Sequence, residues 1–485
     1  MSPSLGRGRV FGAMLTTAAV LFGAGCSTTL QGNAVSVFND PFLVAGMPAT
    51  DGPTGLRATA EDPARRVRGT DGGEIDWLAA SAISDIEQYW DFAYPEAFYD
   101  EFASVKALIS FDASDFGGNF CGGDTYGLVN AAFCYPDRTI GWDRSELLPS
   151  LRRAYGDMGV VLVLAHEYGH AVAHQAGLYG KGIPTLVGEQ QADCFSGAYM
   201  RWVAGGNSPR FSLSTSDGLN NVLAGMISFR DPVFNEGDPD AGVDEHGSAF
   251  ERLSAFQFGF TDGASACAAI DLREIGQRRG DLPVLLPEDH TGELPVSRDT
   301  VRSIVEAMGI LFTPADPPAL SFDTADAENC ADARPSPPAS FCPATNTIVV
   351  DLIGLQKMGA QSARRDGSSL AIGDNTAYSV LVSRYMTAIQ AEHGGVELDD
   401  AMAALRTACL TGVATVRLTS EVTLSGGDTI ALTAGDLDEA LSGILTNGLV
   451  ASDVNGESVP SGFARIDAFR LGVLSDTDRC FQRFS

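Results

Sequence analysis

An internal repeat constrains this chain more than any other feature of its 485-residue sequence. Cysteines, aromatic residues and glycines of the first half recur in the same order about 210 residues later. The matched segments of the first half are Ile109-Ser110-Phe111-Asp112, Cys121, Phe133-Cys134, Thr139-Ile140, Asp143, Cys194-Phe195-Ser196-Gly197, Phe250, Arg252, Phe256, Gly259 and Cys267. Their partners are Leu320-Ser321-Phe322-Asp323, Cys330, Phe341-Cys342, Thr347-Ile348, Asp351, Cys409-Leu410-Thr411-Gly412, Phe463, Arg465, Phe469, Gly472 and Cys480. The repeat predicts two domains of one fold, each of about 200 residues.

The repeat also orders the cysteines. Eight of the nine cysteines fall at matching positions, two pairs in each half. Sequence alone does not fix the connectivity of eight cysteines, but a shared fold requires the same pairing twice. The expected disulfides are Cys121–Cys134, Cys194–Cys267, Cys330–Cys342 and Cys409–Cys480. A disulfide at Cys194 speaks against a role for it as nucleophile or metal ligand.

The ninth cysteine lies near the N-terminus. Arg7 and Arg9 precede an uncharged apolar run of about 16 residues, which is short for a membrane span and typical of a signal peptide over residues 1–25. Small residues directly before Cys26 resemble the lipobox of bacterial lipoproteins, in which that cysteine becomes lipidated. An ordinary secretory signal and an uncleaved anchor are the alternatives. Each places the remaining chain outside the cytoplasm, where disulfides form. Residues 26–75 lack an apolar period and are interpreted as a flexible, lipid-anchored tether.

The charge balance bears on partners. The chain has 62 acidic and 32 basic residues and a formal net charge of −30. Nucleic-acid backbones need clustered Lys and Arg, so no nucleic-acid partner is expected.

Chemistry is concentrated in one segment. An apolar, proline-free run leads directly into His166-Glu167-Tyr168-Gly169-His170. On a helix His166 and His170 lie one turn apart, about 5–6 Å, so both imidazoles can bind one zinc ion. Glu167 then lies beside the metal, where it can take a proton from zinc-bound water. The chain has only six histidines, so a chance match to this pattern is rare.

The third zinc ligand is expected from the next helix, predicted over residues 184–202. His174 is too far along the first helix to converge on the same ion, about 12 Å of rise beyond His166. Glu189 and Asp193 lie one turn apart on the second helix and present two carboxylates. We expect Glu189 to be the ligand and Asp193 to orient His166 or His170 through the other ring N–H. A solvated acidic face is the alternative for this pair.

The combined pattern resembles a known family. His166-Glu167-Tyr168-Gly169-His170, followed by Glu189-Gln190-Gln191-Ala192-Asp193-Cys194-Phe195-Ser196-Gly197, is similar to the HExxH and ExQADCxxG motifs of the bacterial neutral zinc metallopeptidases. With the lipobox, the whole chain resembles actinobacterial, mycobacterial-type lipoprotein metalloproteinases. The resemblance covers roughly residues 76–270. It implies a gluzincin-type peptidase fold, with a strand near Thr139–Asp143 lying over the cleft.

One further histidine falls within the family-like region. A peptidase needs a group that stabilises the oxyanion formed when water attacks the peptide carbonyl. His246 is the candidate, and a loop histidine without a role is the alternative.

The catalytic positions do not recur in the second half. Aligning Gly156-Asp157 with Gly373-Asp374 sets His166, Glu167 and His170 against Ser383, Arg384 and Thr387. The cysteine match sets Glu189 and Asp193 against Ala404 and Ala408, and His246 falls against Val459. The second half therefore has the fold-building residues without the zinc chemistry.

These patterns together predict an α+β protein. A mainly helical, gluzincin-like zincin domain with a small sheet is expected over residues 76–272, a linker over 273–298 and a degenerate copy over 299–485. The expected function is an extracytoplasmic, lipid-anchored zinc metallopeptidase with one Zn²⁺ per chain, an endopeptidase rather than an exopeptidase. Its partners are a protein or peptide substrate and, through Cys26, the membrane; the second domain binds substrate or regulates. The alternative is a non-catalytic, zinc-stabilised scaffold lipoprotein of the cell envelope.

Overall fold

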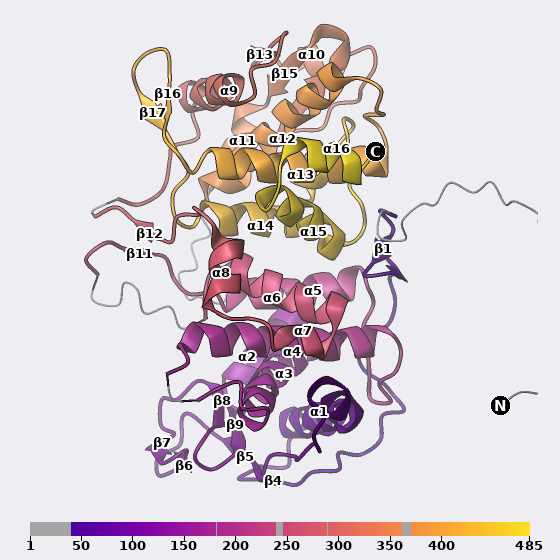
Figure 1. Cartoon of the computed structure of the whole chain (residues 1–485), viewed down its shortest axis with the longest axis vertical. Helices are drawn as coiled ribbons and strands as arrows, with labels where there is room; N and C mark the ends of the chain where they lie inside the picture. Colours follow the sequence, from indigo (N-terminus) through magenta and orange to yellow (C-terminus); the bar gives the residue numbers. More distant parts are fainter. Residues whose placement is uncertain (1–39, 181, 239–245, 289, 361–369) are drawn as a thin grey trace, which may run out of the picture. The chain divides into compact units, whose positions relative to one another are not determined.

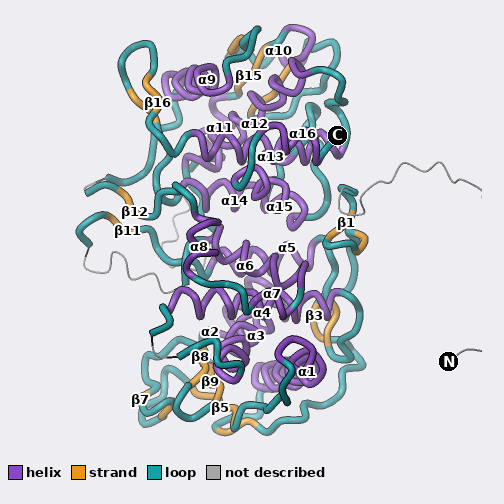
Figure 2. Tube along the Cα trace, in the orientation of Figure 1, coloured by secondary structure: helices purple, strands orange, loops and turns teal. Residues whose placement is uncertain are grey.

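Helices supply most of the regular structure, and the strands form small sheets (Figure 1, Figure 2). The computed structural model describes residues 40–180, 182–238, 246–288, 290–360 and 370–485. The α+β class with small sheets is therefore confirmed. Among these residues, no helix combines the length and apolar character of a membrane span. The predicted signal peptide and Cys26 lie outside the described residues.

The first half is organised around helix α3. Its helices are α1 (Glu74–Phe98), α2 (Leu147–Tyr155), α3 (Asp157–Gln175), α4 (Thr185–Ala204), α5 (Asp217–Ser228), α6 (Ala249–Asp262), α7 (Ala264–Cys267) and α8 (Leu272–Arg279). Gly156 separates α2 from α3. Most residues of α3 are buried, on all sides of the helix, because α1, α2, α4 and α5 pack around it. The histidine motif thus lies on a central helix.

One four-stranded sheet flanks this helix. The strands of the first half are β1 (Leu43–Val44), β2 (Met47–Pro48), β3 (Gly55–Leu56), β4 (Val67–Arg68), β5 (Ala107–Phe111), β6 (Asn119–Phe120), β7 (Gly123–Asp124), β8 (Ala131–Cys134), β9 (Thr139–Asp143), β10 (Phe211–Ser212) and β11 (Phe234–Asn235), and β11 pairs with β12 (Leu285–Leu286). The sheet has the order β4-β5-β9-β8. The pairs β4/β5 and β5/β9 are parallel, and β9/β8 is antiparallel. β8 is an edge strand.

The second half contains the helices α9 (Arg298–Phe312), α10 (Ala325–Glu328), α11 (Leu352–Met358), α12 (Asp374–His393), α13 (Ala401–Arg417), α14 (Asp436–Thr446), α15 (Gly462–Val473) and α16 (Thr477–Arg483). Its main sheet joins β13 (Ala319–Ser321), β15 (Thr347–Val350) and β14 (Ala339–Cys342), in that order, and β16 (Val422–Thr423) pairs with β17 (Thr429–Ile430). The expected match of Ile109 with Leu320 is wrong by one residue. Leu108 faces Ile140, as Leu320 faces Ile348.

All four expected disulfides are present. Cys121 bonds Cys134 and Cys194 bonds Cys267 in the first half. Cys330 bonds Cys342 and Cys409 bonds Cys480 in the second half. The pairing inferred from the repeat is confirmed.

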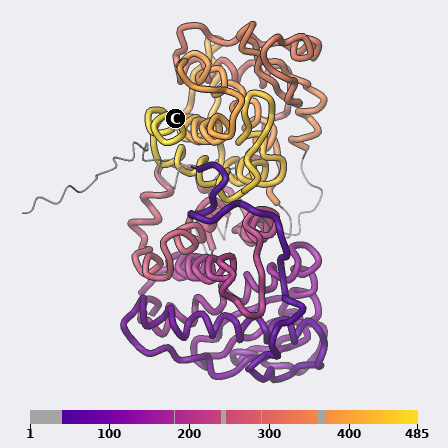
Figure 3. Tube along the Cα trace, turned by 90° about the vertical axis from the view of Figure 1, so that its right-hand side faces the viewer, coloured from indigo at the N-terminus to yellow at the C-terminus, as the bar shows by residue number. Residues whose placement is uncertain are grey.

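The flexible tether expected over residues 26–75 is wrong for the part from residue 40 onward. β3 pairs with β10, and β4 joins the main sheet beside β5. The backbone N–H of Leu56 bonds the carboxylate of Asp157, and Val44 is fully buried. Figure 3 shows this segment as the darkest indigo trace, which begins beside the second half and then runs along the first half. Each docking contact spans only two residues, so no apolar period is visible in the sequence.

The linker expected over residues 273–298 also needs correction. α8 occupies residues 272–279, and its Arg278 is buried and donates to the carbonyl of Glu251 and to Gln190. The first half therefore extends through Arg279. At the other end, the N–H of Leu294 bonds Asp374, and α9 begins at Arg298. The segment before α9 is thus attached to the second half, as the segment before α1 is attached to the first.

Candidate metal centre

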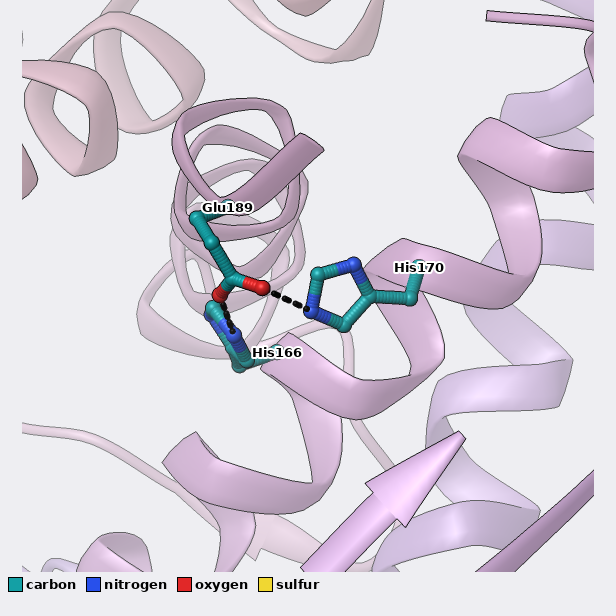
Figure 4. Close-up of side chains that lie close together, drawn as sticks. All are labelled: His166, His170 and Glu189. Carbon is teal, nitrogen blue, oxygen red and sulfur yellow. Dashed lines mark hydrogen bonds and ion pairs between the residues drawn. The ribbon is translucent and has the colours of Figure 1, made fainter. Parts of the chain in front are cut away.

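Two helices bring the predicted ligands together. His166 and His170 project from one face of α3, and Glu189 projects toward them from α4 (Figure 4). His166 Nε2 lies 3.0 Å from Glu189 Oε2, and His170 Nε2 lies 3.3 Å from Glu189 Oε1. One ligand atom from each residue lies within 4.8 Å of the other two. Three donors thus converge on a common point.

A glycine within the histidine motif allows this convergence. A Cβ atom on Gly169 would lie 2.8 Å from the Cα atom of Ala192, on the facing turn of α4. Any larger residue would push α4 away from α3. Ala192 is three residues after Glu189 on the same helix. The close contact between the helices at Gly169 and Ala192 therefore positions Glu189 next to the two imidazoles.

A buried charge network orients His166. Its Nδ1 lies 2.7 Å from Asp193 Oδ1. Arg252 on α6 donates to both oxygens of Asp193, from Nε at 2.9 Å and from Nη2 at 2.7 Å. Both oxygens are therefore engaged, so Asp193 fixes the ring and leaves Nε2 facing Glu189. Arg252, which the sequence pattern marked only as a repeated residue, holds that carboxylate in place.

The charges in this network shift the pKa values strongly. Burial favours neutral His166, but Asp193 and Glu189 outweigh it and raise its pKa to about 10. Burial likewise favours neutral Glu189, yet His170 and His166 hold its pKa well below the usual range. The two shifts describe an ion pair between His166 and Glu189, in which a proton on His166 occupies the place that a metal ion would take.

Glu167 lies between this cluster and the sheet. Its Oε2 accepts a hydrogen bond of 2.9 Å from the backbone N–H of Phe133 on β8. Burial raises the pKa of Glu167. A raised pKa and a fixed position suit a group that accepts and returns a proton. The strand expected over the cleft, Thr139–Asp143, is β9, which lies inside the sheet; β8 is the strand that contacts Glu167.

Two supporting residues were not found from the sequence. The hydroxyl of Tyr135 lies 3.3 Å from Nδ1 of His170. Asp231 accepts from the backbone N–H groups of His246 and Gly247, and its Oδ1 lies 3.2 Å from His246 Nδ1. The Phe133-Cys134 match ends one residue before Tyr135, and no pattern marks the loop that carries Asp231.

His246 lies at the rim of the cluster. Its Nε2 is 3.8 Å from Glu189 Oε2, and its side chain is 41% exposed. The same residue lines a pocket with Glu167, His166 and Arg252, together with Asn130, Ala131, Leu147, Leu162, Val163, Met226 and Phe229. His246 is therefore at the edge of a pocket that opens beside the ligand cluster.

The donor set fits zinc. Two imidazole nitrogens and one carboxylate oxygen are a frequent protein ligand set for this ion, and a catalytic site leaves a fourth position open. His246, Asp193 and His174 do not belong to the converging group. The ring of His174 packs against Tyr135 and Phe133 instead. The described residues thus supply three ligands without a fourth.

Comparisons with protein-family models, curated proteins and solved structures found no match for this chain.

Proposed function

We propose that this chain is a zinc-dependent metallopeptidase that cleaves peptide bonds at the pocket beside His166, His170 and Glu189. One observation carries the proposal: three ligands converge, and a fixed carboxylate, Glu167, lies next to them in a pocket. The lack of a fourth ligand among the described residues speaks against the purely structural zinc of a scaffold protein.

The residues around the ligands have separate tasks. His166, His170 and Glu189 would hold the zinc ion, which would supply Lewis-acid chemistry to the scissile carbonyl and to water. Glu167 accepts the proton of the attacking water and passes it to the leaving amine. His246, held by Asp231, donates a hydrogen bond to the developing oxyanion. Asp193 and Arg252 keep the ring of His166 in place.

The edge strand β8 offers a way to hold the substrate. An edge strand presents backbone groups that its own sheet does not use. On β8 the outward N–H groups of Phe133 and Ala131 donate to the side chains of Glu167 and Asn130, and Ala131 lines the pocket. An extended peptide that pairs with β8 would replace these contacts or bond the strand's outward carbonyls, and it would run past Glu167. This mode suits a segment within a longer chain, so we propose an endopeptidase.

We also propose that the second half is a degenerate copy of the first. The two main sheets share the order of parallel and antiparallel strands, with Phe133 facing Ile140 and Phe341 facing Ile348. A Cβ on Gly259 or Gly472 would lie 1.7 or 1.8 Å from the carbonyl oxygen of Cys194 or Cys409, so both halves need glycine at the same helix crossing. The copy binds substrate or regulates the first half.

The cell envelope is the proposed location. Four disulfides support an oxidising compartment outside the cytoplasm. The lipobox-like sequence before Cys26 supports a lipid anchor.

The test is a cleavage assay with the purified, zinc-loaded chain on a library of unstructured peptides, with new N-termini identified by mass spectrometry. We expect cleavage by the wild type, loss with a zinc chelator and recovery on adding zinc. Glu167→Gln should keep zinc and the fold but lower cleavage by about 10²–10⁴-fold. Glu101→Gln, an exposed glutamate away from the pocket, is the matched control. Full activity of Glu167→Gln would refute the mechanism.

A further inference from the structure

A second group of carboxylates lies far from the histidine motif in sequence. Asp374 is the first residue of α12, Glu439 belongs to the first turn of α14, and Glu293 precedes α9. One carboxylate oxygen of each lies within 4.8 Å of those of the other two. Asp436, the first residue of α14, is close enough to influence Asp374 electrostatically. Three segments distant in sequence thus meet through negative charges.

Asp374 is the buried centre of this group. The residue is 5% exposed. Its Oδ2 accepts the N–H of Leu294 at 2.8 Å, whereas its Oδ1 is buried and has no hydrogen-bond partner in the described structure. Burial raises the pKa of Asp374, and the carboxyl of Glu293, the charged group that acts on it most strongly, raises it further. A buried carboxylate oxygen without a partner is costly, so this atom needs a ligand or a proton.

Backbone groups hold the other two carboxylates in position. The N–H of Asn375 donates to Glu439 Oε2 at 2.8 Å, and the N–H of Asp374 donates to Glu293 Oε2 at 3.3 Å. Each of these bonds uses only Oε2 of the glutamate, so Oε1 takes no part in it. The first turn of α12 therefore fixes the glutamates around Asp374 without neutralising the full charge of the group.

The group repels itself. Burial and then the neighbouring carboxylates raise the pKa of Glu439 to about 9. Burial is also the main cause that raises the pKa of Asp374 and of Asp436 to about 7. The charged groups that act most strongly on Glu439 are the carboxylates of Glu293, Asp436 and Asp374. A cation bound among them would remove this penalty.

In the first half, an arginine neutralises the aspartate at the matching position. Asp157 is the first residue of α3 and accepts the N–H of Leu56 at 3.1 Å, as Asp374 accepts that of Leu294. There, however, Arg152 Nε lies 2.9 Å from Asp157 Oδ1. The oxygen that is paired with a guanidinium in the first half is the one left unpaired in the second.

We propose that Glu293, Asp374 and Glu439, with Asp436 beside them, bind one Ca²⁺ ion. An all-oxygen set rich in carboxylates selects a hard cation, whereas zinc prefers sites with nitrogen or sulfur. Ca²⁺ accepts several carboxylates in flexible geometry, whereas Mg²⁺ demands a near-ideal octahedron and keeps its waters. Glu293 and Asp374 also line a surface pocket, through which the ion has access.

The bound ion would tie the segment before α9 to the first turns of α12 and α14. Its role is to stabilise the second half, and it is independent of zinc and of catalysis.

The experiment uses the full zinc-loaded chain, dialysed into calcium-free buffer that contains micromolar zinc. Calorimetric titration with CaCl₂ should show one site, and saturating Ca²⁺ should raise the unfolding midpoint by about 5 °C. MgCl₂ at the same concentration should give a much smaller shift. Wild-type protein that shows neither Ca²⁺ binding nor a shift would overturn the proposal.

Variants separate binding from folding. Glu439→Gln removes one charge from a self-repelling group, so it should fold and unfold at or above the calcium-free wild-type midpoint, yet lose the response to Ca²⁺. Asp436→Asn should weaken the response. Asp157→Asn, the matching residue of the first half, should respond as the wild type does. An undiminished calcium response in Glu439→Gln would refute the assignment.

Discussion

Helices α3 and α12 are built alike and used differently. Each begins directly after a glycine, Gly156 or Gly373, and each is largely buried. Where α3 carries Glu167, α12 carries Arg384. The guanidinium of Arg384 donates to the carbonyls of Asp453 and Leu449 and to the hydroxyl of Ser452. Burial lowers its pKa to about 10.

The two halves differ in the loop that packs over the middle of this helix. In the first half, the loop after α5 carries Asp231, which holds His246 at the rim of a pocket. In the second half, the loop after α14 is bound to the helix by Arg384. One buried arginine therefore fixes a loop at the level where the other helix presents the histidines proposed to bind zinc. The following predictions test this comparison, beginning with the largest effect.

The zinc content should fall on substitution in the first half and not on substitution at the matching position of the second. His166→Ala removes one of three ligands, so we expect zinc to fall from about one ion per chain to less than about a tenth. Ser383→Ala, at the matching position of α12, should leave zinc unchanged. Elemental analysis after dialysis measures both. Two zinc ions per wild-type chain would contradict the degenerate second copy.

The oxyanion contact should be specific to the first half. We expect His246→Ala to lower kcat/KM about 100-fold with zinc retained, because a hydrogen bond to the transition state is lost. Val459→Ala, at the aligned position of the second half, should leave kcat/KM unchanged. Peptide cleavage and zinc content, measured on the same samples, test this. Full activity of the His246→Ala variant would mean that His246 is a loop histidine without a catalytic role.

The charge network behind His166 should matter for both metal and fold. Asp193→Asn weakens the orientation of the ring and should lower zinc affinity by about 10–100-fold. It also leaves Arg252 buried without its carboxylate, so we expect a loss of about 3–5 kcal/mol in unfolding free energy. Competition with a zinc chelator and denaturant unfolding measure the two effects. Unchanged zinc affinity would mean that Asp193 only supports the fold.

Arg384 should affect stability alone. Arg384→Met leaves buried carbonyls without a donor, so we expect the unfolding free energy to fall by about 1–3 kcal/mol. Zinc content and cleavage by the folded protein should not change. Arg334→Met, which removes an exposed pair with Glu457, is the control and should cost less than about 1 kcal/mol. A loss of cleavage in folded Arg384→Met would mean that the second half acts on the first.

Local spacing was sufficient to predict that the three proposed ligands converge. His166, His170 and Glu189 lie at one-turn separations or on consecutive helices, where periodicity fixes the facing side chains. The repeat was sufficient for the four disulfides, because one fold requires one pairing. Asp231 and Tyr135 could not be found this way, because each reaches its histidine from another element through tertiary packing.

Domain boundaries were the least predictable part. β3 and β4 are two-residue strands whose partners, β10 and β5, lie elsewhere in the chain. Neither shows a periodicity, so composition favoured a tether. The matching bonds of Leu56 to Asp157 and Leu294 to Asp374 join aligned aspartates to segments that the repeat had not matched. The donors are backbone N–H groups, so the residue types of the segments before α1 and α9 did not reveal the bonds.

The docked segment before α1 limits how far the proposed enzyme can stand from a membrane. A chain spans at most about 3.5 Å per residue, so a free tether over residues 26–75 would reach about 170 Å. Because the chain is packed into the described structure from Val44 onward, where β1 lies against α15, a lipid on Cys26 would hold it on fewer than 20 residues, a reach of roughly 60 Å. The proposed substrates would then be proteins at or near the membrane surface.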